Sequence, residues 1–151
     1  KAEAAKAALQ GLNSDVKIIA YPFFIDETCA ADIIADYDMV VGATDNFKSR
    51  LCIDAETKKH KKAFVHASIC EFEGQLGVFN YRGAKSYQDL FGNTSDEQTH
   101  SLGVLGILPG IVGSMQALEV IKIILDRGDV TLNTLTIYDA FRNSSEIIFY
   151  D

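Results

Sequence analysis

The stretch Met39–Ala43 limits the fold of this chain more than any other feature, because every one of its residues is apolar. A strand with one face in water alternates apolar and polar side chains, whereas a strand of a parallel sheet is covered by helices on both faces and does not alternate. The next segment, Phe47–Lys59, is predicted to be a helix. A buried strand followed at once by a helix predicts an α/β fold of the doubly wound, Rossmann-like kind.

The second half of the chain supplies further strands. Residues 63–69 and 74–81 are predicted strands, and Thr131–Tyr138 and Ser145–Tyr150 are predicted to form an antiparallel hairpin that turns near Asn143. Together these segments predict a mixed, mostly parallel sheet that has helices on both faces and ends in the hairpin.

The first 35 residues are predicted to contain a helix, a strand and a second helix. Lys1–Leu9 is rich in the best helix formers, and Val16–Tyr21 is predicted to be a strand that Pro22 closes. Asp26 can then cap a short helix that runs through Ile34.

The longest apolar stretch lies between Leu105 and Leu125. Three polar residues interrupt it, so it is interpreted as a buried helix, about Pro109–Arg127, and no membrane span is expected. Because this helix is apolar around most of its circumference, we expect it to be central to the core. Glycines recur here every three or four residues, which is interpreted as close helix packing; they are Gly103, Gly106, Gly110 and Gly113.

Composition and charge exclude several classes of protein. With 151 residues, 48% of them hydrophobic, the chain can bury one core, so a single domain over residues 1–151 is expected. The formal net charge of -7 argues against nucleic-acid binding, which depends on clustered Lys and Arg. Three cysteines at no metal-like spacing favour a reducing compartment, and a cytoplasmic address is therefore expected.

Polar residues follow the apolar strand directly, in the order Thr44, Asp45, Asn46. This order places Asp45 at the carboxyl end of a parallel strand, where open α/β sheets bind their ligands. Beside bound phosphates, a carboxylate is useful when it holds a magnesium ion that bridges the phosphate oxygens. The alternative is that Asp45 caps the helix that follows, a common role of aspartate and asparagine.

Four ordered segments together resemble one enzyme family. They are Gly42–Arg50, Ala67–Ile69 with Phe72–Leu76, Gly103–Gly106 with Gly113–Lys122, and Leu135–Ala140. In this order they resemble the ThiF/MoeB/HesA-type adenylyltransferases of the ubiquitin-activating enzyme superfamily, nearest to the bacterial enzymes of molybdopterin and thiamine synthesis. Four motifs at compatible spacing are far more specific than any one of them. The resemblance covers nearly the whole chain, as the C-terminal part of such a domain.

The resemblance implies an activity and a set of site residues. The parent protein would use ATP and magnesium to adenylate the C-terminal glycine of a ubiquitin-like sulfur-carrier protein, and family members are commonly homodimers. Lys1 falls on the position that contacts the phosphates of ATP, Asp45 on the position associated with magnesium, and Asn46 beside it in the cofactor-binding segment. Arg50 is a further catalytic candidate, with a salt-bridged residue on the helix surface as the alternative.

The chain also departs from the family pattern. The glycine-rich nucleotide-binding unit of the family would lie before Lys1, so this chain alone is expected to be inactive. Ser86–Asp89 stands where many members carry the first Cys-x-x-Cys pair of a zinc site, so zinc is not expected.

A further departure concerns the polar segment 82–102, which the resemblance assigns to an irregular crossover loop over the tail of the carrier. Thr99 stands at the position of the family's loop cysteine, and a threonine hydroxyl cannot replace a thiolate in sulfur or thioester transfer. These departures leave a non-catalytic module that binds a carrier or a partner as the alternative function.

Overall fold

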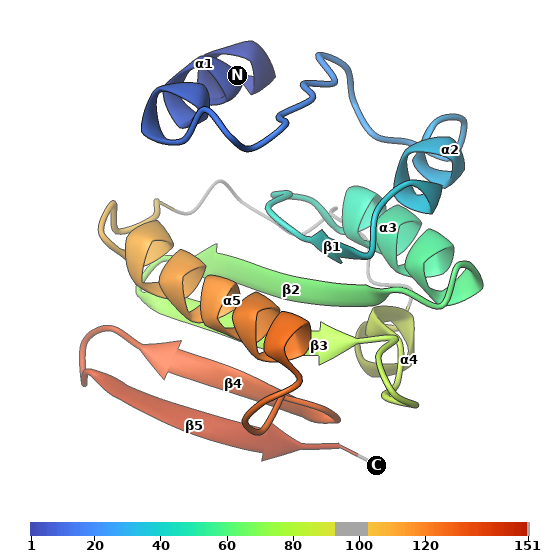
Figure 1. The fold of residues 1–151 in the computed structure, drawn as a ribbon. Helices are drawn as coiled ribbons and strands as arrows, with labels where there is room; N and C mark the ends of the chain where they lie inside the picture. The colour runs from blue at the N-terminus through green and yellow to red at the C-terminus, as the bar shows by residue number, and fades with distance from the viewer. Residues whose placement is uncertain (93–102, 151) are drawn as a thin grey trace.

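The computed structural model describes residues 1–92 and 103–150, which form a five-stranded sheet with helices on both faces (Figure 1). The strand order follows the sequence, from β1 at one edge to β5 at the other. The strands are β1 (Met39–Val41), β2 (Ala63–Cys70), β3 (Glu73–Phe79), β4 (Thr134–Asp139) and β5 (Ser144–Phe149). The predicted mixed sheet and its C-terminal antiparallel hairpin are confirmed.

The balance of strand directions differs from the expected, mostly parallel sheet. Between the described strands, β1 and β2 pair in parallel, whereas the β2–β3, β3–β4 and β4–β5 pairs are antiparallel. Short connections account for the antiparallel β2–β3 and β4–β5 pairs. Only Glu71 and Phe72 separate β2 from β3, and a link this short can join only antiparallel neighbours, while α3 provides the longer crossover between β1 and β2.

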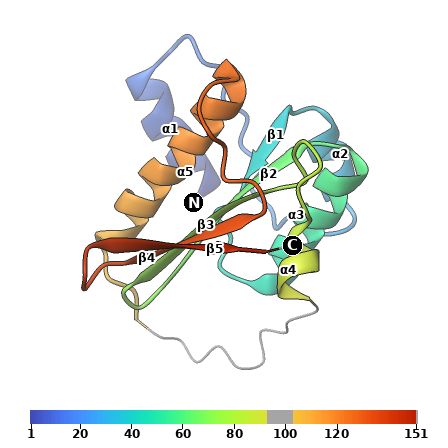
Figure 2. The ribbon, with the colours of Figure 1, turned by 90° about the horizontal axis from the view of Figure 1, so that it is seen from below.

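Helices cover the two faces of the sheet unequally, with α5 on one face and α3 and α4 on the other (Figure 2). The helices are α1 (Ala2–Leu12), α2 (Ala30–Ala35), α3 (Phe47–Lys59), α4 (Tyr87–Phe91) and α5 (Leu108–Leu125). The bounds of α3 are those predicted, because Asn46 caps its first turn: its side-chain oxygen accepts a hydrogen bond from the Ser49 N–H at 2.8 Å.

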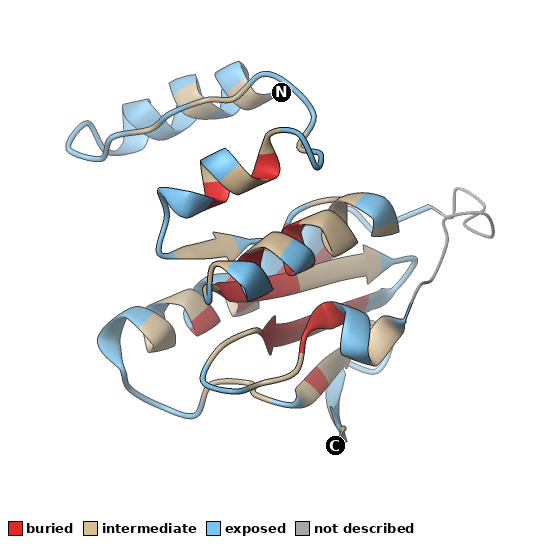
Figure 3. Ribbon diagram, turned by 90° about the vertical axis from the view of Figure 1, so that its right-hand side faces the viewer, coloured by how far each residue is buried: buried red, intermediate tan, exposed pale blue. Residues whose placement is uncertain are grey.

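Burial within the sheet is concentrated in the neighbouring strands β2 and β3 (Figure 3). On the α3 face, Phe64 and Phe79 are register partners and pack with Ile53 of α3 and Tyr87 of α4. The alternate residues of the same strands, such as Val65, are also fully buried, and they face the α5 side.

A buried carboxylate holds α4 in place. The side chain of Asp54 on α3 accepts hydrogen bonds from the backbone N–H groups of Tyr87 at 2.8 Å and Gln88 at 3.1 Å, and from the Asn80 side chain at 2.8 Å. Ser86 and Asp89 complete a capping box at the same helix end. The segment predicted to be irregular over residues 82–102 therefore contains a helix, while residues 93–102, including Thr99, lie outside the described part of the chain.

The predictions for the first 35 residues are only partly confirmed. The first helix is present, but Val16–Tyr21 is not a strand, and Ile19 there is 47% exposed. A strand requires a neighbour, and within the described residues β1 pairs only with β2. Asp26 does not cap a helix directly; its carboxylate accepts from the Thr28 N–H at 2.9 Å, and α2 begins at Ala30.

The helix α5 buries one side only. Its buried residues are Leu108, Val112, Gln116 and Glu119, and they face the sheet. By length and composition alone α5 could cross a membrane, yet this side carries an amide and a carboxylate that pair within the protein. The prediction that α5 is central to the core is thus correct for one face, whereas its other face exposes Leu118, Ile121, Ile124 and Leu125.

Close packing of α5 depends on glycines other than those predicted. A Cβ added at Gly103, Gly106, Gly110 or Gly113 would meet nothing within 4 Å, so the close-packing interpretation of these four glycines is wrong for the described structure. A Cβ at Gly74 on β3 would instead overlap the Cγ2 atom of Val112 on α5. The absence of a side chain at Gly74 is what lets α5 approach the sheet.

We expect Gly74→Ala to lower the free energy of unfolding by about 1–3 kcal/mol, because the stiff, β-branched Val112 cannot move aside without shifting α5. Urea denaturation measures the change. Gly110→Ala is the matched control, since its methyl group meets open space within α5 and should be neutral or stabilising. Equal losses in the two variants would contradict the close contact.

Candidate functional site

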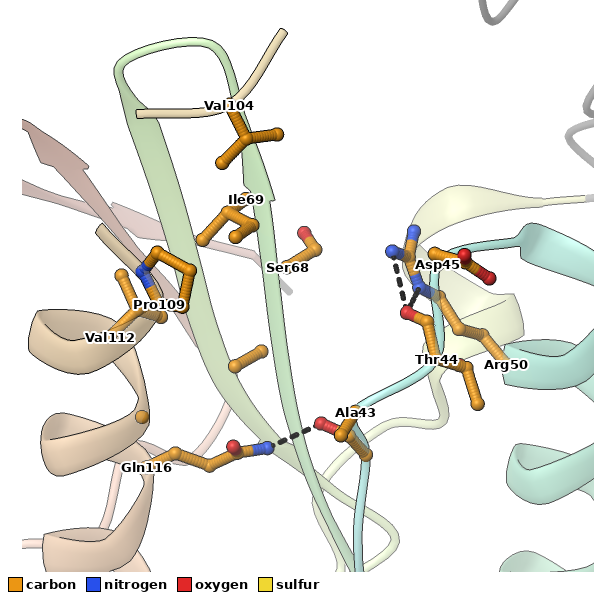
Figure 4. A pocket seen from close by; sticks show the side chains of 13 residues that line it. Ala43, Thr44, Asp45, Arg50, Ser68, Ile69, Val104, Pro109, Val112 and Gln116 are labelled. Atoms are coloured by element: carbon orange, nitrogen blue, oxygen red, sulfur yellow. Dashed lines mark hydrogen bonds between the residues drawn. The ribbon is translucent and has the colours of Figure 1, made fainter. Parts of the chain in front are cut away.

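A crevice of ≈ 420 Å³ opens where β1 and β2 end (Figure 4). One wall is the loop that follows β1, with Thr44 and Asp45, and the opposite wall is the first half of α5, with Pro109 and Val112. The carboxyl end of β2 lies between the walls. The crevice therefore lies at the end of the sheet where the parallel strands β1 and β2 have their carboxyl ends.

Asp45 lies exposed in the wall formed by the loop after β1. The residue that caps α3 is Asn46 and not Asp45, so the carboxylate of Asp45 accepts no capping hydrogen bond from this helix. Its Oδ1 atom accepts a hydrogen bond from Asn46 Nδ2 at 3.2 Å. This hydrogen bond is the main cause that lowers the pKa of Asp45, followed by its own backbone N–H and by the charges of Lys1 and Arg50. Asp45 is therefore ionised at neutral pH.

The side chain of Arg50 reaches back from α3 to the same loop. Its Nε and Nη2 atoms donate to the Thr44 carbonyl at 3.3 and 3.1 Å, and the guanidinium lies 5.4 Å from the centre of the Phe47 ring. These contacts fix a positive charge in the lining of the crevice. The alternative of a salt-bridged surface residue does not describe this geometry, because the acceptor is a backbone carbonyl.

The structure brings Asp45, Asn46 and Arg50 together but places Lys1 differently. Lys1 precedes α1 and lines a separate hollow with Tyr21 and Phe23. Its charge nevertheless contributes to the lowered pKa of Asp45. The predicted phosphate-binding lysine is thus electrostatically linked to Asp45 without sharing its crevice.

Gln116, a polar residue within the apolar helix, forms the floor of the crevice (Figure 4). Its Nε2 atom donates to the carbonyls of Gly42 and Val65 at 2.7 and 2.8 Å. An amide in the middle of an apolar helix was the available signal, because a buried amide requires partners.

His66 is a second buried residue beside the site that the sequence did not single out. It follows Val65 on β2, is 1% exposed, and neither of its ring nitrogens has a hydrogen-bond partner among the described residues. Its imidazole ring packs against the rings of Phe64, Tyr87 and Phe91. Desolvation, with a smaller contribution from the charge of Arg50, lowers its pKa to about 3. The ring is therefore neutral.

Across residues 1–92 and 103–150, no group of three or more His, Cys, Asp or Glu side chains could hold a metal. At the position of the family's first zinc pair, Ser86 and Asp89 are engaged in capping α4. A single carboxylate such as Asp45 suits an ion that also takes ligands from a bound phosphate and from water.

Comparisons with known sequences find relatives along nearly the whole chain. The sequence profile of the ThiF family matches residues 1–149. The chain is 35% identical over 151 residues to a probable molybdopterin-synthase adenylyltransferase of Porphyra purpurea, covering 97% of this chain and 40% of that protein. It is 35% identical over 154 residues to the SAMP-activating enzyme E1 of Haloferax volcanii, covering 99% of this chain and 57% of that protein. The chain thus spans about half of these relatives.

Solved structures share the fold. The crystal structure of E. coli MccB with ATP aligns with a TM-score of 0.78 at 15% identity, covering 98% of this chain and 47% of that one. The structure of PaaA aligns with a TM-score of 0.80 at 12% identity, covering 99% of this chain and 55% of that one. At such identities the likeness establishes a common architecture.

We expect acid to destabilise the protein through His66. Because its pKa in the folded state, about 3, lies below the ordinary value of 6.5, the stability from the neutral ring is complete above pH 6.5 and is lost as the pH falls toward 3. Between pH 7.5 and 5 the loss should be about 2 kcal/mol. The variant His66→Leu keeps a buried apolar side chain that does not titrate. Its free energy of unfolding, measured by urea denaturation, should therefore fall less between pH 7.5 and 5 than that of the unmodified protein, by this amount. Parallel profiles for the two proteins would refute the buried neutral ring.

Proposed function

This chain belongs to the ThiF family, and we propose that it forms part of an ATP-dependent adenylyltransferase that activates the C-terminal glycine of a ubiquitin-like sulfur-carrier protein. The observation that carries the proposal is the ionised carboxylate of Asp45, which does not cap a helix and belongs to a residue at the rim of an open crevice at the carboxyl end of β1. The names of the relatives in Porphyra purpurea and Haloferax volcanii support the same reaction class.

The reaction that we propose requires no nucleophile from the protein. An oxygen of the carrier's terminal carboxylate attacks the α-phosphorus of ATP, the bond from that phosphorus to the bridging oxygen breaks, and pyrophosphate leaves with the electron pair. The product is an acyl-adenylate. The protein therefore contributes position and charge, which are the main factors in reactions at phosphorus.

The charges around the crevice suit this chemistry. Asp45 would hold a magnesium ion, which neutralises phosphate charge and orients the triphosphate. Arg50, whose guanidinium is fixed by the Thr44 carbonyl, and Lys1, whose charge reaches Asp45, would offset the remaining negative charge of the nucleotide. Asn46 donates to Asp45 while its oxygen caps α3, so we assign it the task of orienting the carboxylate.

The carrier would place its extended tail in the crevice and its folded body on the neighbouring rim. Phe72 precedes β3 and stacks on Phe141 in the β4–β5 turn, with ring centres 3.9 Å apart. Both rings are exposed, and they lie at the end of the sheet to which the crevice belongs. An exposed aromatic pair beside a peptide-sized crevice is a suitable contact for a protein substrate.

Assembly and location are further parts of the proposal. The exposed face of α5, formed by Leu118, Ile121, Ile124 and Leu125, would pack against a second protomer, because an apolar face of this kind is typical of a subunit interface. The protein would act in the cytoplasm, in keeping with its free cysteines.

A non-catalytic module that binds the carrier or another partner is the second candidate. It is favoured by Thr99 at the position of the loop cysteine, because a threonine cannot form the sulfur-linked intermediates that cysteine forms. Acyl-adenylate formation does not need that cysteine, so the two candidates differ in whether pyrophosphate exchange takes place.

In the full-length protein, Asp45→Asn should lower carrier-dependent ATP–pyrophosphate exchange by at least about 100-fold, since the variant keeps the size of the side chain and removes the negative charge that a metal requires. The exchange of labelled pyrophosphate into ATP measures this step directly. Asp15→Asn removes an exposed carboxylate outside the crevice and is the control. Exchange that is absent from the unmodified protein would instead favour the non-catalytic module.

Replacing Phe141 with Ser should raise the KM for the carrier about tenfold and leave the KM for ATP unchanged, because the substitution removes an exposed aromatic contact of about 1–2 kcal/mol. Phe149→Ser is a matched control: Phe149 is 80% exposed against 75% for Phe141, but it lies at the opposite end of β5. If the two variants raise the KM equally, the carrier does not dock on this rim.

A further inference from the structure

The carboxamide of Gln116 joins two layers of the molecule. It extends from α5 and donates to the carbonyls of Gly42 at 2.7 Å and Val65 at 2.8 Å, which belong to neighbouring parallel segments. The Gly42 N–H also donates to the Val65 carbonyl, at 2.9 Å. The carboxamide therefore clamps the β1–β2 pair just beyond the last residue of β1. Gln116 is 7% exposed, so these contacts are made in the interior, where a lost donor is costly.

Gly42 is the residue at which the chain leaves the sheet for the loop that carries Asp45. The far end of this loop is held by α3, through Arg50 on the Thr44 carbonyl and through the Asn46 cap. The near end is held by Gln116, which comes from the opposite wall of the crevice (Figure 4). Gln116 thus connects α5, one wall of the crevice, to the end of β1, where the loop that carries Asp45 begins.

We propose that Gln116 is a positioning residue for the adenylation site. By fixing Gly42 against α5, its carboxamide sets how far the Asp45 carboxylate stands from the α5 wall, and hence where a metal-bound triphosphate lies relative to the peptide tail. The inference rests on the proposed function, because Gln116 acts through Asp45 and through the width of the crevice. A displacement of about 1 Å in a catalytic group can lower a rate by about 100-fold, so loss of the contacts of Gln116 should lower kcat.

Glu119 offers a control on the same helix. It is buried on the same side of α5, but its carboxylate accepts from the Thr131 N–H at 3.1 Å and pairs with Lys122 at 2.5 Å. These contacts fix the segment before β4 and do not involve Gly42 or β1. Glu119→Gln therefore disturbs buried polar contacts of α5 without touching the clamp.

The test is a double-mutant cycle in the full-length protein, with ATP–pyrophosphate exchange at saturating carrier as the readout. Gln116→Met keeps the length and burial of the side chain but removes both hydrogen bonds, and it should lower kcat about 10–100-fold with the KM for the carrier changed less than about threefold. Asp45→Glu displaces the carboxylate by one methylene group and leaves residual activity. On that background Gln116→Met should lower kcat less than about threefold, because the carboxylate is already misplaced.

A pH profile supplies a second measurement if Gln116→Met does not fold. The protonated carboxyl group of Gln116→Glu can donate to a carbonyl, whereas its ionised form cannot, so its kcat relative to the unmodified protein should fall about tenfold or more as the pH rises from 6 to 9. Glu119→Gln should show a constant ratio across the same range.

The outcomes separate the inference from the proposed function. Equal losses of kcat from Gln116→Met on the two backgrounds, or a flat pH ratio for Gln116→Glu, would overturn the positioning role alone. Full exchange activity in both Asp45→Glu and Asp45→Asn would overturn the assigned site and the positioning role together. An attenuated loss on the Asp45→Glu background supports the clamp.

Discussion

The parallel pairing of β1 with β2 is the contact on which the crevice depends. The register of Met39 with Ala63 brings the carboxyl ends of the two strands to one edge of the sheet. The loop after β1 then faces the first half of α5 across β2. Two charged residues assigned to the chemistry reach this end of the sheet from different elements, Asp45 from the loop and Arg50 from α3. If the strands ran antiparallel, their carboxyl ends would lie at opposite edges and no such convergence could occur.

Buried polar groups in this protein fall into two kinds. Asp54 and Gln116 are almost fully buried and meet donors or acceptors from other elements, so each fixes the position of a segment distant in sequence. Desolvation of such groups is compensated only while all their partners stay in place, which makes the contacts selective for one arrangement. His66 is the opposite kind, because its ring is buried among aromatic side chains without a polar partner in the described chain.

Local features of the sequence were sufficient to predict much of the architecture. The strand that begins at Met39, the bounds of α3 and the final hairpin follow from apolar patterning, a capping asparagine and turn residues, all of which act within a few positions. That strand ends at Val41, two residues before the predicted end at Ala43. The same reasoning located Asp45 at the end of a parallel strand. Its magnesium role remains a prediction.

The features that could not be predicted depend on residues far apart in the chain. Gln116 meets carbonyls 74 and 51 positions away, and Asp54 caps a helix that begins 33 positions later, so neither contact leaves a local pattern. Val16–Tyr21 has the composition of a strand but no neighbour to pair with in the described structure. Close approach of α5 depends on Gly74 in another element, and not on the glycines of α5 itself.

The aromatic surroundings of His66 give the protein an internal spectroscopic probe. Four rings have centres between 4.8 and 6.1 Å from the centre of its imidazole, and their ring currents displace its proton resonances from those of solvated histidines. With three histidines in the sequence, this signal is readily resolved in a proton NMR spectrum. His66 follows Val65 on β2, whose carbonyl accepts a hydrogen bond from Gln116 in the floor of the crevice. Its chemical shift therefore reports whether the interior of the sheet keeps its native arrangement when a surface variant is introduced.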